Sequence, residues 1–354
     1  MHQAADGALA RIRLPGGMIS AEQLGALAAA ATRFGSATLE LTSRGNVQAR
    51  GVTDTGAFAD AVADAGLLPS PSHERVRNVV ASPLSGRSGG TADVRAVVLA
   101  LDAAIQRDAV LEGLPGRFLF GVDDGRGDVS GLGTDAAVHA LTPDVGAVLL
   151  SGVDTGVRVA LDDAVDVLTG IARRFVGIRD KSWRIDELDD SGVLLDGLER
   201  TADAGATWPP EVRPPVGWIA QDDGRVALGA AVRLGVLEAR TAEFLAAIEA
   251  PLVITPWRSV LVCDLDEGVA DVALRVLAPL GLVFDADSPW LSVSACTGSP
   301  GCERSLTDVR RDAAEAVLEP TGVHRHFVGC GRACGSPPVG EVLVATEDGY
   351  RRRD

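Results

Sequence analysis

The sequence has little of several residue types, and each shortage excludes a class of protein. Its 354 residues include five cysteines, one lysine and 4% aromatic residues, and no apolar run reaches the roughly 18 residues of a membrane-spanning helix. Acidic residues outnumber basic ones by 49 to 33, and the net charge of −16 argues against a general nucleic-acid or anionic-membrane surface. The first residues show no basic stretch followed by an apolar one, so a cytoplasmic protein without a signal peptide is predicted.

What is present is typical of a folded, multidomain protein. Apolar types make up 46% and charged types 23% of the chain, and at about 150 residues per domain the length predicts two to three domains. Because Lys181 is the single lysine, 33 minus 1 leaves 32 arginines as nearly the only groups able to hold carboxylates. Any anionic substrate must therefore meet a local basic pocket.

Four of the five cysteines lie within the last 59 residues, in the order Cys296, Cys302, Cys330 and Cys334. The spacing is C-x5-C, a gap of 27 residues, then C-x3-C, and small residues around each pair would let the backbone approach an inorganic core. This pattern favours a 4Fe-4S cluster. Structural zinc in a binding module, or redox thiols, are the alternatives, which analysis for iron, sulfide and zinc would separate. Cys263 lies in an apolar run and is interpreted as a core residue.

The segment between the two cysteine pairs predicts a helix over 303–318 and a short strand over 324–328. The N-terminus of that helix is expected to face the cysteine loop, where its dipole would stabilise a negatively charged cluster.

An internal repeat divides the chain in two. Residues 10–52 and 224–265 each predict a strand, a helix and a strand, and the segments that follow, 77–122 and 294–330, also match. Only the second copy carries the thiols, and a Pro-rich linker at 203–215 separates the copies. The sequence therefore predicts a duplicated, pseudo-two-fold body with a shared cleft.

The cysteine pattern and three arginine motifs, at 41–51, 77–79 and 114–118, resemble the nitrite and sulfite reductase family, including its precorrin-3B synthase branch. The resemblance covers nearly the whole chain. It implies an α+β fold of two ferredoxin-like half-domains and two α/β cluster-type domains. The implied ranges are a first half-domain at 1–70, a cysteine-free α/β domain at 71–202, the linker at 203–215, a second half-domain at 216–285 and a 4Fe-4S domain at 286–354.

The same resemblance implies the site residues. The four clustered cysteines would ligate the 4Fe-4S cluster, and Cys334 would bridge to a tetrapyrrole iron if sirohaem is bound. The tetrapyrrole would be held by five residues: Arg44, Arg77, Asn78, Arg117 and Arg332. The resemblance does not identify catalytic residues. His324 and His326 are the candidates for ligating a further mononuclear non-haem iron.

One position favours the precorrin-3B synthase branch. The reductases usually carry a lysine two positions beyond Arg117, where it helps to bind a small oxyanion, and this chain has Leu119. The branch implies O2-dependent hydroxylation of precorrin-3A with lactone formation in aerobic cobalamin biosynthesis. The alternative is a sirohaem- and 4Fe-4S-dependent nitrite or sulfite reductase.

Electrons are expected from a separate partner, a ferredoxin or an NAD(P)H-dependent reductase. The segment 131–136 superficially matches a dinucleotide-binding fingerprint, but no convincing strand precedes it and no helix clearly follows. A nicotinamide site in this chain is therefore not predicted.

Overall fold

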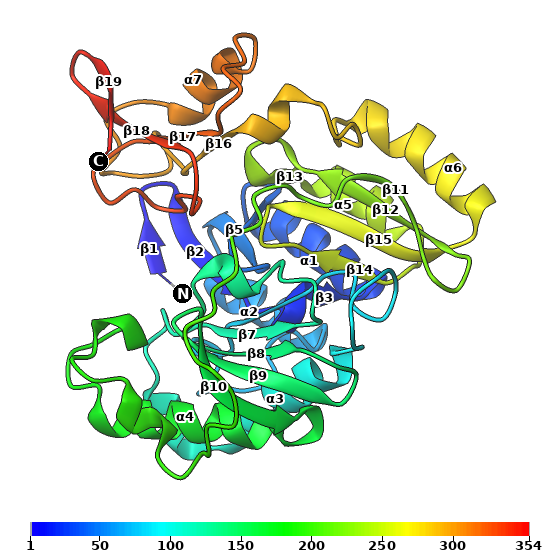
Figure 1. Cartoon of the computed structure of the whole chain (residues 1–354). Helices are drawn as coiled ribbons and strands as arrows, with labels where there is room; N and C mark the ends of the chain where they lie inside the picture. The colour runs from blue at the N-terminus through cyan, green and yellow to red at the C-terminus, as the bar shows by residue number, and fades with distance from the viewer. Residues whose placement is uncertain (1, 354) are drawn as a thin grey trace.

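The computed structural model describes residues 2–353 as four β-sheets with helices packed against them (Figure 1). The strand orders are β1-β2-β5-β4-β13, β11-β12-β15-β14-β3, β10-β9-β8-β7-β6 and β16-β17-β18-β19. This is the predicted α+β fold class. No helix in the described range is both long and apolar enough to cross a bilayer.

The first two sheets have the same order of strands and share one core. The first consists of β1 (His2–Ala4), β2 (Gly7–Ile12), β5 (Val47–Val52), β4 (Thr38–Leu41) and β13 (Val236–Glu238). The second consists of β11 (Gly217–Ala220), β12 (Val226–Ala231), β15 (Ser259–Leu265), β14 (Leu252–Ile254) and β3 (Met18–Ile19). The helices of this region are α1 (Ala21–Phe34), α2 (Thr55–Asp64), α5 (Ala239–Ala246) and α6 (Glu267–Leu277). Helix α1 contacts α5, and one cluster of buried side chains spans both sheets.

The two halves exchange their edge strands. Strand β3 leaves the N-terminal half to pair with β14, and β13 returns from the other half to pair with β4. The turn before β3 requires glycine, because Gly17 has φ = 73° and a Cβ there would lie 1.9 Å from the Ile254 carbonyl oxygen. The half-domains are therefore interlocked, and the predicted residue boundaries remain a prediction.

The other two sheets also share one topology. One contains β6 (Val79–Ala81), β7 (Phe120–Asp123), β8 (Ala136–Ala140), β9 (Val145–Leu150) and β10 (Val153–Ala160), with helices α3 (Arg95–Arg107) and α4 (Ala164–Ile178). The other contains β16 (Val293–Ala295), β17 (Arg325–Val328), β18 (Glu341–Thr346) and β19 (Gly349–Arg352), with α7 (Val309–Ala316). Each begins with two parallel pairings and continues with an antiparallel one. The sequence repeat is thus a repeat of structure.

The predicted helix over 303–318 is wrong in length. Helix α7 begins only at Val309, where the Asp308 side chain accepts a hydrogen bond from the Arg311 amide. The residues before it form turns, and the Leu306 amide donates to the Gly329 carbonyl. The helix thus begins later than predicted, although its first residue still lies against the cysteine loop, where a Cβ on Gly298 would be 3.1 Å from the Val309 amide nitrogen.

Candidate active site

The four clustered cysteines lie on two adjacent loops. Strands β16 and β17 are parallel, with Ala295 opposite Phe327, so the loops that follow them leave the same edge of the sheet. Cys296 begins the first loop, and its amide donates to the Phe327 carbonyl. Cys330 lies two residues beyond the end of β17. The topology thus brings the two cysteine pairs together.

The thiols are close enough to affect one another. Burial raises the pKa of the Cys334 thiol, and the thiols of Cys296, Cys330 and Cys302 raise it further, while Arg332 opposes them. The Gly329 amide points at the Cys296 sulfur, with an N–S distance of 3.4 Å. Four neighbouring thiols, free of disulfides and supplied with a backbone N–H, are a donor set that fits a 4Fe-4S cluster.

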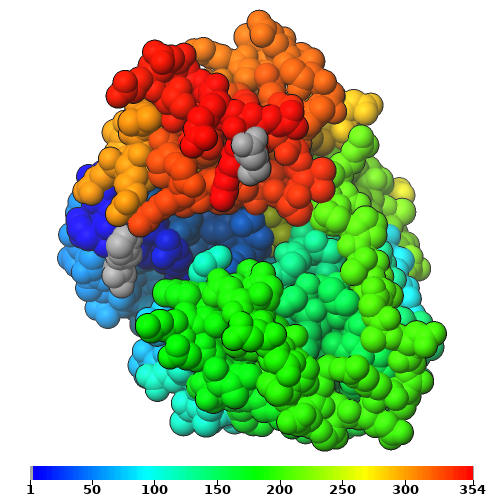
Figure 2. Space-filling model, turned by 60° about the vertical axis from the view of Figure 1, so that its left-hand side comes forward, coloured from blue at the N-terminus to red at the C-terminus, as the bar shows by residue number. Residues whose placement is uncertain are grey.

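A basic cavity of about 480 Å³ opens beside two of these cysteines, Cys296 and Cys334. In Figure 2 the surface is hollowed between the orange and red C-terminal region and the green segment, with blue N-terminal residues at the floor. Seven arginines line the cavity: Arg11, Arg13, Arg44, Arg75, Arg117, Arg258 and Arg310. Among the described lining residues Glu40 is the one carboxylate, and it pairs with Arg310.

The positive charge of this cavity is largely uncompensated. The pKa of Arg13 is lowered to about 10, chiefly by burial and in addition by the nearby charges of Arg44 and Arg11. Burial lowers the pKa of Arg44 to about 10 as well, with Arg184 as the next cause. Both groups stay protonated at neutral pH, although each charge is disfavoured. Carboxylates of a ligand would relieve this repulsion, so the cavity suits a polyanion.

A second cavity, of about 410 Å³, continues from the first and shares Arg44, Arg117 and Arg258 with it. Much of its remaining wall is apolar and includes Leu119 and Trp257. The Leu119 side chain is buried and packs with Val80, Val129, Leu132 and Trp257. The combined cleft therefore has a basic side and an apolar side.

The predicted arginines have different positions relative to this cleft. Arg44 lines both cavities and donates to the carbonyls of Gly116 (3.1 Å) and Arg117 (3.0 Å). Arg117 also lines both, and its side chain is 58% exposed, with Glu187 at 3.8 Å. Arg332 is exposed on the loop between Cys330 and Cys334 and does not line either cavity.

Arg77 and Asn78 lie behind the cleft and line neither of its cavities. The guanidinium of Arg77 is held by two carboxylates, Asp102 at 2.7 Å and Glu74 at 3.0 Å. The Asn78 side chain is buried and donates to the carbonyls of Arg75 and Gly116. Arg77 thus does not line the cleft, and its charge is already compensated by two carboxylates. Asn78 positions two loops of the cleft wall.

Neither His324 nor His326 has an open position at a ring nitrogen. One nitrogen of each ring lies by the Ser294 hydroxyl oxygen, at 2.8 and 2.7 Å, and the single proton of that hydroxyl can be donated to one ring at a time. The other nitrogen of His326 donates to the Cys334 carbonyl, and the other nitrogen of His324 to the Leu291 carbonyl. Burial lowers the pKa of His326 to about 3, so this ring stays neutral. These two histidines do not fit a mononuclear iron site.

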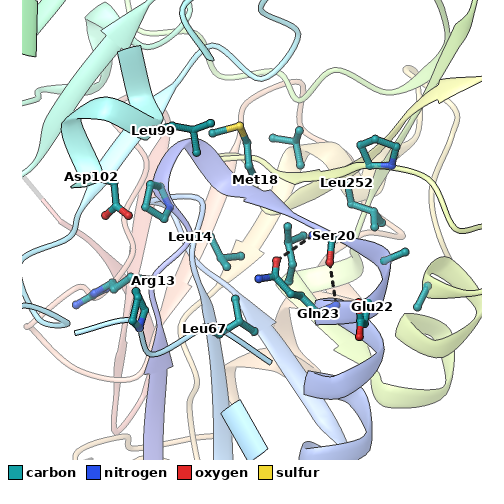
Figure 3. A pocket seen from close by; sticks show the side chains of 18 of the residues that line it. Arg13, Leu14, Met18, Ser20, Glu22, Gln23, Leu67, Leu99, Asp102 and Leu252 are labelled. Atoms are coloured by element: carbon teal, nitrogen blue, oxygen red, sulfur yellow. Dashed lines mark hydrogen bonds between the residues drawn. The ribbon is translucent and has the colours of Figure 1, made fainter. Parts of the chain in front are cut away.

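A third cavity, of about 1050 Å³, is a different feature (Figure 3). Of the arginines of the basic cavity it shares Arg13 alone, and its described lining includes no cysteine. Several of its polar groups are already bonded to one another: Ser20 and Gln23 cap α1 reciprocally, and Asp102 holds Arg77. We therefore do not assign the reaction to it.

Sequence reasoning missed several cleft arginines, and two signals could have found them. Arg11 and Arg13 flank the buried Ile12 along the polypeptide, so alternation places both on the cleft side of β2. Arg258 follows β14 as Arg44 follows β4, so the internal repeat relates the two. No comparable signal marks Arg310, because it reaches the cleft from α7.

Comparisons with known proteins agree with this architecture. Residues 2–57 match the family model of the nitrite/sulfite reductase ferredoxin-like half domain. A ferredoxin–nitrite reductase of Synechococcus elongatus is 25% identical over 396 residues, covering 94% of this chain and 75% of that protein. A precorrin-3B synthase of Sinorhizobium is 25% identical over 371 residues, covering 98% and 79%. The structure of the Mycobacterium tuberculosis NirA protein has a TM-score of 0.80 and 20% identity, covering 97% and 73%.

The duplicated fold, with a four-cysteine site beside a basic cleft, and the oxidoreductases it resembles define the class of this protein as an oxidoreductase. Within that class, residues 2–57 match the ferredoxin-like half domain of nitrite and sulfite reductases, and the chain as a whole is similar to a nitrite reductase and to a precorrin-3B synthase.

Proposed function

We propose that this chain is a precorrin-3B synthase, a cytoplasmic monooxygenase that hydroxylates precorrin-3A and closes a lactone with a ring acetate. The reaction would insert one oxygen atom of O2 into the macrocycle. The other oxygen atom would leave as water, which requires two electrons and two protons. The single observation that carries the proposal is the cleft itself, with arginines on one side and an apolar wall at Leu119 on the other.

The basic side supports a tetrapyrrole as the ligand. Precorrin-3A carries about eight carboxylates around its rim, and each can accept a two-pronged bond from a guanidinium. Six of the seven arginines in the basic cavity have no carboxylate within 3.5 Å among residues 2–353. In a chain with a net charge of −16, such a concentration of free cations is best explained by a polyanionic substrate.

The apolar side supports the precorrin-3B synthase branch over the reductases. A lysine at position 119 would present an ammonium to a small oxyanion, whereas Leu119 packs between Val80 and Trp257. A buried hydrocarbon wall provides no positive charge or hydrogen-bond donor for sulfite or nitrite, and it excludes water from that side of the macrocycle. The arginines would then orient the ring, and the apolar wall would hold its face.

The cysteines support the proposed cofactor. Cys296, Cys302, Cys330 and Cys334 would hold a 4Fe-4S cluster, which when bound supplies single-electron transfer next to the macrocycle. The electrons would come from a separate donor, a ferredoxin or an NAD(P)H-dependent reductase. No mononuclear iron is assigned to His324 and His326, because every ring nitrogen lies within 3.2 Å of the Ser294 hydroxyl or of a main-chain carbonyl.

The alternative is a sirohaem-dependent nitrite or sulfite reductase. It is favoured by the equal identity of the nitrite reductase relative and by the position of Cys334 on the wall of the basic cavity. In that case sirohaem would occupy the arginine-lined cavity, and Cys334 would bridge its iron to the cluster.

One experiment separates the two functions. The reconstituted holoprotein, with a chemical reductant, is incubated anaerobically with precorrin-3A, sulfite or nitrite, and O2 is then admitted to the precorrin sample. We expect precorrin-3A to gain the mass of one oxygen atom, with no consumption of sulfite or nitrite. Reduction of either anion with unchanged precorrin would establish the alternative.

A further inference from the structure

The Pro-rich linker does more than connect the two halves. Glu211, Val212 and Pro214 lie on the wall of the 410 Å³ cavity, which is also lined by the three arginines that it shares with the basic cavity. Sequence analysis interpreted this region as a plain linker. We name residues 211–214 the linker segment, and its position makes it part of the cleft.

The linker segment is held at both ends and loosely in the middle. Upstream, Thr207 bridges to Val153, and the Trp208 ring lies 4.3 Å from the ring of His139. Downstream, β11 pairs with β12 from Gly217 onward. Such anchors fix where the segment crosses the cleft.

Within the segment, one hydrogen bond reaches the rest of the described chain. The indole Nε1 of Trp257 donates to the Glu211 carbonyl at 2.8 Å. The amides of Val212 and Arg213 bond only to the carboxylate of Glu211, inside the segment itself. Trp257 therefore fixes the position of the linker segment relative to the cavity.

We propose that the linker segment is a specificity-determining wall of the tetrapyrrole site, and that Trp257 is its positioning residue. This inference rests on the proposed function and deepens it. Val212 and Pro214 contribute hydrocarbon to the lining of the cavity, and Arg44, Arg117 and Arg258 contribute positive charge to the same cavity. A planar macrocycle with a carboxylate rim matches this division: its rim meets the guanidinium groups and its ring meets Trp257 and the linker segment.

A matched pair of variants tests the wall. Val212→Asp places a negative charge in the wall of a cavity that is proposed to hold an anionic ligand, and Val212→Asn has nearly the same size without the charge. The probe is uroporphyrin, a fluorescent tetrapyrrole octacarboxylate, titrated into the full-length protein. We expect the aspartate variant to bind about tenfold more weakly than the asparagine variant, with the gap narrowing at high salt. Val212 is partly exposed, so neither change should impair folding.

Hydrogen exchange provides a second measurement without any substitution. Binding of uroporphyrin should slow exchange at the amides of residues 211–213 about tenfold and leave the hairpin at 346–349 unchanged. Trp257→Phe keeps the aromatic ring but removes the N–H donor, so it should speed exchange in the linker segment. Trp218→Phe, which changes an exposed tryptophan outside both cavities, is the control.

The outcomes distinguish the two proposals. In one outcome, uroporphyrin binds saturably and its binding depends on Arg44, but the two Val212 variants have equal affinities and hydrogen exchange at residues 211–213 does not change. That outcome would overturn this inference and leave the proposed tetrapyrrole site intact. No saturable, Arg44-dependent binding would overturn the proposed function and this inference with it.

Discussion

Replacing Arg44 tests the basic cleft most directly. Two of the guanidinium N–H groups of Arg44 donate to main-chain carbonyls, at 3.1 and 3.0 Å, which fixes the fork in the cleft. Three of the five N–H donors of a guanidinium then remain for a ligand. Because burial lowers the pKa of Arg44 to about 10 and no lower, the group is cationic at neutral pH.

The magnitude follows from these contacts. Hydrogen bonds to a charged partner contribute about 1.5–3 kcal/mol, so Arg44→Ala should weaken the binding of a tetrapyrrole carboxylate by about 10-fold to 150-fold. Arg44→Lys keeps the charge but loses the fork, and we expect an intermediate loss. The assay is the quenching of uroporphyrin fluorescence, from which Kd is obtained.

The control removes the same charge elsewhere. Arg275 lies on α6, is 76% exposed and lines neither cavity of the cleft. Arg275→Ala should leave Kd unchanged within error, since exposed charges are screened by salt. If Arg44→Ala and Arg275→Ala bind uroporphyrin equally well, the reasoning from uncompensated cleft charge is wrong.

Three further predictions follow from buried groups. Arg77→Ala leaves two half-buried carboxylates without their cation and should lower the free energy of unfolding by about 1.5–3 kcal/mol while Kd per folded molecule stays unchanged; an unaltered melting temperature would contradict this. Burial raises the pKa of Asp128 from 3.8 to about 7, so the folded state holds a proton there and stability falls as the pH rises through that range; Asp128→Asn should flatten this part of the thermal-unfolding profile. A Cβ on Gly329 would lie 1.8 Å from the Ser305 hydroxyl oxygen, so Gly329→Ala should displace the cysteine loops and lower the iron content after reconstitution. Gly331→Ala, where a Cβ meets no atom within 4 Å, is the control and should leave the iron content unchanged.

The duplication could be predicted from the sequence, because each copy repeats the same order of strands and helices over long, periodic segments. The strand exchange could not. Strand β3 has two residues and β13 has three, and each pairs with a strand from the other half of the chain. Such short segments have no periodicity of their own, and their pairing depends on glycine turns whose close contacts exist only in the folded state.

The cysteine loops and part of the cleft were predictable for a similar reason. Their residues fall at motifs, and Arg44 lies in the turn between β4 and β5, although the carbonyls that it bonds belong to Gly116 and Arg117 of another segment. Arg77 was misleading, since a motif arginine has the same sequence signature whether it faces a cleft or a pair of carboxylates. The contribution of the linker segment was hidden, because proline-rich composition indicates a connection but not the surface that the connection crosses.

The two copies of the α/β unit close their corresponding loops in different ways. Strand β6 ends at Ala81 as β16 ends at Ala295, so Ser82 occupies in the first copy the position of Cys296 in the second. The Ser82 hydroxyl donates to Asp128 at 2.6 Å and accepts from the Asp124 amide. The cavity beside it measures only about 10 Å³. In the first copy, hydrogen-bonded side chains thus occupy the space that corresponds to the cysteine site of the second copy.

The second copy has a small core instead, with seven buried hydrophobic residues in its main cluster among the described residues, and it has thiols where the first copy has these polar bonds. Small units of this kind usually need a staple such as a metal group. Removing iron with a chelator under reducing conditions should therefore speed hydrogen exchange in 293–346 while the sheet of β6 to β10 stays protected. Equal exchange of both units before and after iron removal would show that the cysteine loops need no cluster to stay folded.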